Sequence, residues 1–194
     1  MKNTLLHINA SARNTGSLTR KMTEVLANKI SKDLNLAIVN RDLNQTLPFV
    51  DEQWVSANFT AEEKRTAKQK DKLKLSNTLV KELQEARIIV IGSPLYNFSI
   101  AASLKAWIDM VARAGLTFKY TDSGPQGLLQ DKKVYVAIAS GGVEMGSEYD
   151  FSSNYLKHVL GFLGLNDVNM IDVNQYDVST SSHHLEDQIR AIVA

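Results

Sequence analysis

Two aromatic residues flank an amide in the triplet Tyr96-Asn97-Phe98, which lies between two apolar stretches of the chain. Aromatic rings can stack against a flat ligand, and an amide can exchange hydrogen bonds with the ligand's edge. The triplet therefore suggests a site for a planar, hydrogen-bonding ring system. The same residues could also form a turn whose rings pack into the core, and the triplet alone leaves both interpretations open.

A second segment, residues 11–19, is rich in hydroxyl side chains, with Ser11, Ser17 and Thr19 near the start of a predicted helix. A helix N-terminus presents unpaired N–H groups and the positive end of the helix dipole, and both favour phosphate. The segment lacks the lysine of a nucleoside-triphosphate loop and the GxGxxG pattern of dinucleotide sites. It therefore predicts a monophosphate site. Simple capping of the helix by Ser17 is the alternative.

A third segment, Ala139-Ser140-Gly141-Gly142, follows an apolar run. Paired glycines let backbone N–H groups approach a ligand closely, although they are also common in tight turns. Taken together, the three segments describe a site for a ligand with one phosphate and a planar ring system. Flavin mononucleotide (FMN) fits that description best, bound at the edge of a flavodoxin-like sheet.

The three segments need elements that bring them together. Short apolar runs predict strands, and amphipathic stretches between them predict helices, an alternation typical of doubly wound α/β proteins. We expect a flavodoxin-like, five-stranded parallel sheet in the order 2-1-3-4-5, with helices on both faces, in a single domain over residues 1–194. The predicted strands are residues 5–9, 36–39, 88–92, 134–139 and 166–173. The three segments follow the first, third and fourth strands, whose ends meet at one edge of such a sheet.

Three local predictions concern the chain before and after the third strand. Pro94 is expected to end that strand, so that residues 93–100 form a loop before a helix. The sequence Thr60-Ala61-Glu62-Glu63 matches a capping box and predicts a helix from Thr60 to about Ala86. Before that helix we expect an irregular stretch with a short helical turn near Trp54.

Three further local predictions concern the chain after residue 100. Asp109 and Arg113 are four residues apart on a predicted helix and are expected to form an ion pair. Residues 117–131 are expected to be a long connection, and a single helix is expected to close the chain around Leu185 and Ile189.

Composition narrows the class of protein. The 194-residue chain has a formal net charge of +1, so we expect neither nucleic acid nor a membrane as partner. It has no cysteine, which excludes disulfides and thiol catalysis. His183-His184 has no carboxylate cluster at ligand spacing, so we expect no metal site. We expect a cytoplasmic protein that acts on small molecules, and a solvated helix face at the basic run 64–74.

The sequence resembles one family, the FMN-dependent NAD(P)H azoreductases of bacteria, which also act as quinone reductases. The likeness covers most of the chain and is weakest over residues 44–85 and at the C-terminal tail. It is carried above all by residues 94–100 (PLYNFSI), 104–109 (LKAWID), 112–121 (ARAGLTFKYT) and 124–129 (GPQGLL). Two positions depart from the family: Leu95 stands where methionine is common, and Ser140 stands where the loop often has arginine.

The resemblance implies FMN as cofactor, NADH or NADPH as electron donor, and a homodimer with each flavin near the interface. The residues implied to bind FMN are Ser11, Ser17, Leu18 and Thr19 at the phosphate, Leu95, Tyr96, Asn97 and Phe98 at the ring and ribityl chain, and Ala139, Ser140, Gly141 and Gly142 at the ring's far edge. Asn97 is the candidate for orienting the ring. Candidates for the substrate slot are Tyr120, Phe151 and Phe162.

The cofactor implies a ping-pong reaction, in which a hydride passes from the nicotinamide to the flavin and then to a quinone or azo compound in the same slot. No side chain is expected to act as nucleophile or general base. Three alternatives remain: a flavodoxin-type electron carrier, a general FMN reductase, and a flavin-free binder of phosphorylated small molecules. Electron carriers of this type are usually strongly acidic, and the charge of +1 disfavours that alternative.

Overall fold

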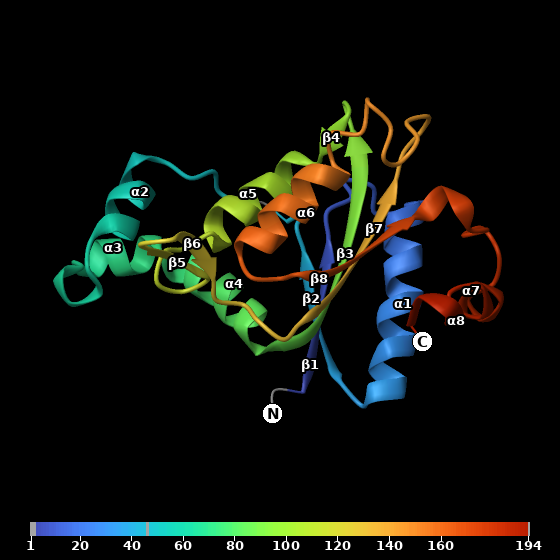
Figure 1. Ribbon diagram of the computed structural model, residues 1–194, viewed down its shortest axis with the longest axis horizontal. Coiled ribbons are helices and arrows are strands. Elements are labelled where there is room, and N and C mark those ends of the chain that lie inside the picture. Colours follow the sequence, from blue (N-terminus) through green and yellow to red (C-terminus); the bar gives the residue numbers. More distant parts are fainter. Residues whose placement is uncertain (1–2, 46, 194) are drawn as a thin grey trace.

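Five parallel strands form the centre of the protein, in the order β2-β1-β3-β7-β8 (Figure 1). They are β1 (Thr4–Asn9), β2 (Ala37–Asp42), β3 (Ala86–Tyr96), β7 (Lys133–Ala139) and β8 (Asp167–Asp172). Counted along the chain, this is the predicted order 2-1-3-4-5, so the flavodoxin-like arrangement is confirmed. The computed structural model describes residues 3–45 and 47–193. Met1, Lys2, Thr46 and Ala194, which the predicted domain includes, lie outside the described residues.

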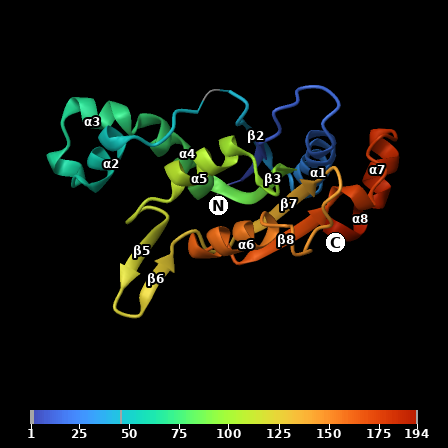
Figure 2. The same ribbon diagram turned by 90° about the horizontal axis from the view of Figure 1, so that it is seen from above.

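Helices cover both faces of the sheet, as Figures 1 and 2 show. One face packs against α1 (Leu18–Leu34) and α7 (Ser182–Gln188), and the other against α4 (Lys74–Glu85), α5 (Ala102–Val111) and α6 (Ser153–Phe162). Neighbouring strand residues divide between the two faces. Leu5 packs on the α1 side and Leu6 on the α5 side, and neither is more than 1% exposed. The sheet is therefore buried on both sides, as parallel sheets generally are.

Helix α1 has an apolar stripe, in which Met22, Leu26 and Ile30 face the sheet and are buried. A Cβ built on Gly92 of β3 would lie 3.2 Å from the Thr23 side chain. The helix therefore passes very close to β3. Leu18, the first residue of α1, does not join the stripe and is 48% exposed at the end of the helix.

The predicted helix from Thr60 to Ala86 is wrong. Thr60 instead ends α2 (Glu52–Phe59), which is longer than the single turn expected near Trp54. The working capping box is six residues later, where Thr66 and Gln69 bond reciprocally and start α3 (Ala67–Lys72). A short 3₁₀ turn, η1 (Glu62–Lys64), precedes it. Helices α3 and α4 are separated at Leu73, where the chain turns. The Leu73 side chain is fully buried and packs with Trp54 of α2.

Pro94 does not end the third strand, which continues to Tyr96. Pairing of β3 with β1 stops at Gly92, whereas pairing with β7 continues to Pro94. Pro94 therefore has a strand neighbour on one side only, a position where a missing N–H is tolerated. The expected loop 93–100 is the end of β3, a two-residue turn, and β4 (Ser99–Ile100), which pairs back antiparallel.

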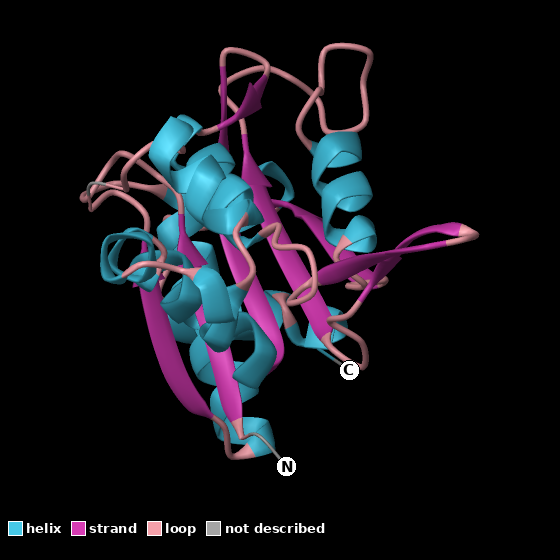
Figure 3. Cartoon of the chain, turned by 90° about the vertical axis from the view of Figure 1, so that its left-hand side faces the viewer, coloured by secondary structure: helices cyan, strands magenta, loops and turns pink. Residues whose placement is uncertain are grey.

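The expected connection 117–131 contains a β-hairpin, β5 (Phe118–Thr121) and β6 (Gly124–Gly127). Figures 2 and 3 show this hairpin projecting from the body of the protein. The expected last helix is also divided, at Ile189, into α7 and α8 (Arg190–Val193).

The predicted ion pair between Asp109 and Arg113 is also wrong. Helix α5 ends at Val111, so helical spacing does not extend to Arg113. Asp109 pairs instead with Lys105, one turn earlier, at 2.7 Å. Arg113 is buried, donates from Nη1 to Ser76 Oγ, and lies with its guanidinium carbon 5.6 Å from the centroid of a Trp54 ring.

Candidate functional site

The carboxyl ends of β1, β3 and β7 bring the three predicted segments to one edge of the sheet. The N–H of Ala10 donates to the carbonyl of Gly92 at 2.9 Å, and Pro94 lies opposite Ala139 in the β3–β7 register. Ser103, at the start of α5, also reaches the carbonyl of Ala10. The hydroxyl segment, the aromatic turn and the double glycine are therefore neighbours across three adjacent strands.

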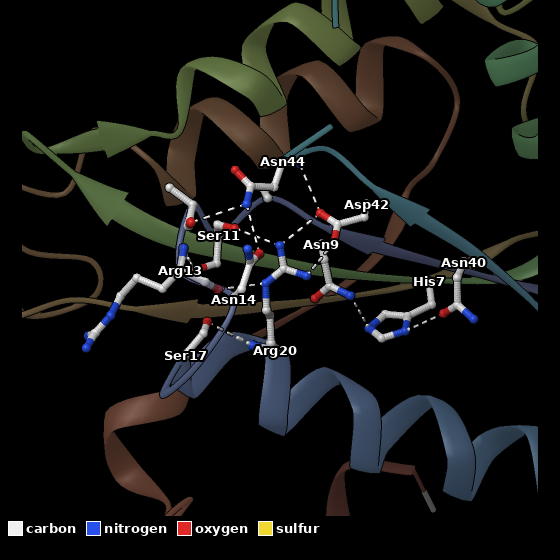
Figure 4. Close-up of polar contacts among 12 residues, drawn as sticks. His7, Asn9, Ser11, Arg13, Asn14, Ser17, Arg20, Asn40, Asp42 and Asn44 are labelled. Atoms are coloured by element: carbon white, nitrogen blue, oxygen red, sulfur yellow. Dashed lines mark hydrogen bonds and ion pairs between the residues drawn. The ribbon is translucent and has the colours of Figure 1, made fainter. Parts of the chain in front are cut away.

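Arg20 holds the hydroxyl segment in place (Figure 4). It donates from Nη2 to the carbonyl of Ser11 and from Nε to that of Arg13, at 2.8 and 2.9 Å. Asp42, at the end of β2, accepts both Nη1 and Nη2 of Arg20, each at 2.8 Å. That hydrogen bonding is the main reason that the pKa of Asp42 lies below its ordinary value. The guanidinium of Arg13, by contrast, points away from these residues (Figure 4).

The start of α1 offers hydrogen-bond donors. Ser17 caps the helix by accepting the N–H of Arg20, as the simpler interpretation predicted, and its Oγ lies 3.2 Å from Thr19 Oγ1. The N–H groups of Leu18 and Thr19 lie in the first turn, where a helix has no carbonyl to receive them. No acidic residue lies in that turn. Free N–H groups, two hydroxyls and the positive end of the dipole suit a phosphate.

The aromatic triplet forms the turn between β3 and β4. Asn97 and Phe98 occupy its two central positions with φ of 48° and 68°, and Tyr96 pairs with Ser99 across it. Two consecutive positive φ values define a type I′ hairpin turn. Tyr96 is half-buried against the core, but Asn97 is exposed and Phe98 is 52% exposed. The alternative in which both rings pack into the core is therefore wrong for Phe98. Leu95 is half-buried beside Tyr96.

The double glycine lies in open space. A Cβ built on Gly141 or Gly142 would meet no atom within 4 Å, and neither residue has a positive φ. The turn itself therefore does not require glycine at either position, whereas a ligand lying against the backbone would. Ala139 ends β7, and Ser140 is fixed by its carbonyl, which accepts Nδ2 of Asn174 at 2.8 Å. This open backbone and the donors at α1 fit a flat ligand with one phosphate.

The three predicted slot residues fall into two groups. Phe151 belongs to the site, because its N–H donates to the carbonyl of Phe98 at 3.1 Å. Tyr120 and Phe162 lie elsewhere, around Phe118, with ring centroids 5.4 and 4.5 Å from it. Phe151 precedes α6 and Phe162 ends it, and a helix of that length spans about 15 Å. One chain alone does not bring the three residues together.

Sequence reasoning missed three residues of this edge: Arg20, Tyr149 and Asp150. The ring of Tyr149 lies 6.4 Å from that of Phe98, and Asp150 is buried beneath the loop that carries both Tyr149 and Phe151. Arg20 acts through Asp42, 22 residues away. Asp150 accepts the N–H groups of Ser152 and Ser153, which is a local signal at the start of a helix. The other two partnerships have no local sequence signal.

Metal clusters and membrane-spanning helices are both absent from the described residues. Among residues 3–45 and 47–193, no three histidine, aspartate or glutamate side chains are grouped so that they could hold a metal ion. Over the same ranges, every helix is too short or too polar to cross a membrane.

The fold and this edge of the sheet define a flavodoxin-like protein, and residues 3–194 match the family described as having the flavodoxin-like fold. An FMN-dependent NADH:quinone oxidoreductase 1 of Jannaschia sp. is 45% identical over 192 residues, covering 98% of each chain. One from Colwellia psychrerythraea is 49% identical over 168 residues, covering 87% of this chain and 88% of the relative. The chain thus belongs to the family of the FMN-dependent NADH:quinone oxidoreductases.

Solved structures agree with this assignment. An azoreductase from Bacillus anthracis superposes with a TM-score of 0.82 at 26% identity, covering 98% of both chains. An FMN-dependent NADH-azoreductase from the same species, solved in complex with FMN, gives a TM-score of 0.81 at 25% identity, covering 99% of this chain and all of the other.

Proposed function

We propose that the protein is an FMN-dependent oxidoreductase that uses NADH to reduce quinones and to cleave azo compounds. The observation that carries the proposal is the edge where β1, β3 and β7 end, with phosphate-type donors at α1, an exposed amide and aromatic turn, and open glycine backbone. Family membership supplies the reaction class. When bound, FMN supplies hydride transfer between the nicotinamide and the acceptor.

Each segment has a role in holding the cofactor. Ser17, Thr19 and the free N–H groups of the first turn of α1 bind the phosphate, with Leu18 and Ser11 beside it. The exposed amide of Asn97 orients the polar edge of the ring, and the N–H groups of Gly141 and Gly142 face its far edge. Leu95 and Tyr96 form the apolar support beneath, and Ala139 and Ser140 hold the glycines in place.

The reaction needs positioning from the protein and no nucleophile. Phe98 and Phe151 are both more than half exposed at the site, at 52% and 62%, and give flat apolar surfaces for a nicotinamide or a quinone. Because both substrates are planar and use the same surfaces, they bind in turn, which gives ping-pong kinetics. NADPH is an alternative donor that the kinetic comparison below separates from NADH.

A homodimer completes the site. The hairpin β5–β6 projects from the body (Figure 3) and carries Tyr120 with 74% of its surface exposed. In the dimer, Tyr120 of the partner subunit and Phe162 of the partner subunit lie over the edge that holds Phe98, so that each flavin is near the interface. The chain works as one FMN-binding domain in the cytoplasm.

One experiment tests the reaction. Purified protein is incubated anaerobically with NADH or NADPH, and then with a quinone, an azo dye or free FMN, while flavin absorbance is followed. We expect a yellow protein that bleaches with NADH alone and regains its colour with quinone or dye. Bleaching that requires a separate reductase would identify an electron carrier, and a preference for free FMN would identify a general flavin reductase.

A variant tests the site. Asn97→Ala removes the amide, so we expect flavin reduction to slow by roughly a hundredfold. Because alanine tolerates the φ of 48° less well than asparagine, the unfolding free energy should fall by up to about 1 kcal/mol, a smaller effect than that on flavin reduction. Asn28→Ala is the matched control, because Asn28 is an exposed amide on α1. Unchanged turnover in Asn97→Ala would show that the ring is oriented by other residues.

A further inference from the structure

Asp150 is a buried carboxylate near the end of the loop that joins β7 to α6. It is 4% exposed. Its Oδ1 accepts the N–H groups of Ser152 and Ser153, at 2.9 and 3.0 Å. Its Oδ2 accepts the N–H of Gly146, at 2.8 Å, and the hydroxyl of Ser153. One side chain therefore ties the middle of the loop to the first turn of α6.

The residues on either side of Asp150 both contact the aromatic turn. Tyr149 places its ring 6.4 Å from that of Phe98, and Phe151 donates its N–H to the carbonyl of Phe98. Phe98 itself has a φ of 68°, a conformation that costs a residue with a Cβ on the order of 1 kcal/mol. The loop thus braces a strained residue, and Asp150 fixes the loop.

The charge of Asp150 is suited to this task. Burial raises the pKa of the carboxyl, but the hydrogen bonds from Ser153, Gly146 and Ser152 outweigh burial, and the pKa lies below its ordinary value. Asp150 is therefore ionised at neutral pH. A carboxylate can accept all four of these hydrogen bonds, whereas an amide cannot.

We propose that Asp150 is a positioning residue that acts through Phe151 and Tyr149, holding them against Phe98 as an aromatic frame for the flat electron acceptor. The inference rests on the proposed function of this edge and names a residue that touches neither cofactor nor acceptor. The frame is more than half exposed at all three rings, with values of 52%, 58% and 62%. Such apolar surface is available for a planar acceptor to cover.

The test compares three variants. Asp150→Asn keeps Oδ1 but loses Oδ2, the acceptor for the N–H of Gly146 and the hydroxyl of Ser153. Ser153→Ala removes only the hydroxyl donor. Asp177→Asn is the control, because Asp177 also accepts the N–H and hydroxyl of a serine, Ser179, in an exposed turn. For Asp150→Asn we expect the KM for quinone to rise about tenfold, with kcat and FMN content within about twofold. Ser153→Ala should show a smaller rise and Asp177→Asn none.

A double-mutant cycle separates positioning from a general loss of stability. Phe151→Ala removes one of the two rings through which Asp150 acts, so the rise in quinone KM on adding Asp150→Asn to it should be clearly smaller than the roughly tenfold rise expected for Asp150→Asn alone. Amide hydrogen exchange gives a second readout. In Asp150→Asn, the amides of residues 146–153 should exchange about tenfold faster, while those of β7 do not change.

The outcomes are distinguishable from failure of the proposed function. If the unaltered protein binds no FMN or does not oxidise NADH, the proposed function fails, and hydrogen exchange still decides whether Asp150 holds the loop. An unchanged quinone KM in Asp150→Asn, or full additivity with Phe151→Ala, overturns the role of Asp150. If Asp150→Asn does not fold, Ser153→Ala carries the same cycle with Phe151→Ala.

Discussion

At the scale of single residues, Phe98 combines exposure with an unfavourable backbone conformation. Type I′ turns favour Asn-Gly, and this turn has Asn97 followed by phenylalanine at φ 68°. Stability alone would favour glycine at position 98. A ring kept there in spite of the strain is consistent with a use for that ring at the candidate site.

Two substitutions at Phe98 isolate the strain. Phe98→Ala and Phe98→Gly both remove the ring, but only glycine adopts the positive φ freely. We expect Phe98→Gly to be more stable than Phe98→Ala by about 1 kcal/mol in the free energy of unfolding, measured with urea. Both variants should have a raised KM for quinone. Equal stabilities would show that the turn relaxes in solution to a negative φ.

His7 is a buried histidine in β1 and carries no predicted role in the reaction. Its Nδ1 lies 3.0 Å from Oδ1 of Asn40, and its Nε2 lies 2.9 Å from Oγ1 of Thr23. Burial lowers the pKa of His7; Arg20 also lowers it, and the bond to Asn40 and the charges of Glu24 and Asp42 offset part of the effect.

This shift makes stability depend on pH. The unfolded chain takes up a proton at His7 near pH 6.5, before the folded chain does. The free energy of unfolding should therefore fall as the pH drops below about 6.5, by at most about 1.4 kcal/mol per pH unit, and level off below the folded-state pKa. Urea titrations from pH 7.5 to 5 measure the slope. His7→Gln should reduce it.

What the sequence reveals about the site depends on how local the signal is. Hydroxyls before a helix, an amide between two aromatics and a double glycine are each visible within a few residues, and the structure brings all three to one edge. Arg20 with Asp42, and Phe98 with Tyr149, are partners that meet only after folding. A single sequence does not predict them, because nothing in the local pattern specifies which distant side chain will be adjacent.

At the scale of elements, local sequence patterns again predict more than contacts between distant residues do. Apolar strands alternating with amphipathic helices predict the sheet order, since few topologies bury both faces of a parallel sheet. The error at residues 60–86 arose because two capping patterns compete there, and the burial of Leu73 against Trp54 decides where the chain turns. The hairpin β5–β6 went unpredicted because its strands are short and mostly polar.

The hairpin is anchored by contact between two glycine backbones. A Cβ built on Gly127, at the end of β6, would lie 2.1 Å from the backbone nitrogen of Gly164, after α6. Gly127→Ala must therefore displace the hairpin or α6, and we expect a loss of about 1–3 kcal/mol in the free energy of unfolding. Gly161→Ala is the control, because its Cβ would have an ordinary contact at 3.7 Å within a helix. It should be neutral or stabilising.

At the scale of the whole molecule, exposed aromatic residues are the main unexplained feature of the surface. Tyr120 is 74% exposed on the projecting hairpin, and Phe49, before α2, and Phe59, at its end, are 75% and 82% exposed. A two-stranded hairpin has little stability of its own. In the proposed homodimer, a second copy of the chain related by two-fold symmetry would cover Tyr120 and place each hairpin over the other subunit's site.

Mixing two inactive variants tests whether the site is shared. Tyr120→Ala removes the contribution of the partner subunit, and Asn97→Ala removes the ring-orienting amide of the same subunit. After subunit exchange, half of the dimers are mixed and each has one intact site, so activity with NADH and quinone should recover to about a quarter of the unaltered protein's. A mixture of Asn97→Ala with the double variant Asn97→Ala/Tyr120→Ala has no intact site and should stay inactive. Light scattering on each sample measures the mass, and a monomer, or no recovery in the first mixture, would contradict a shared site.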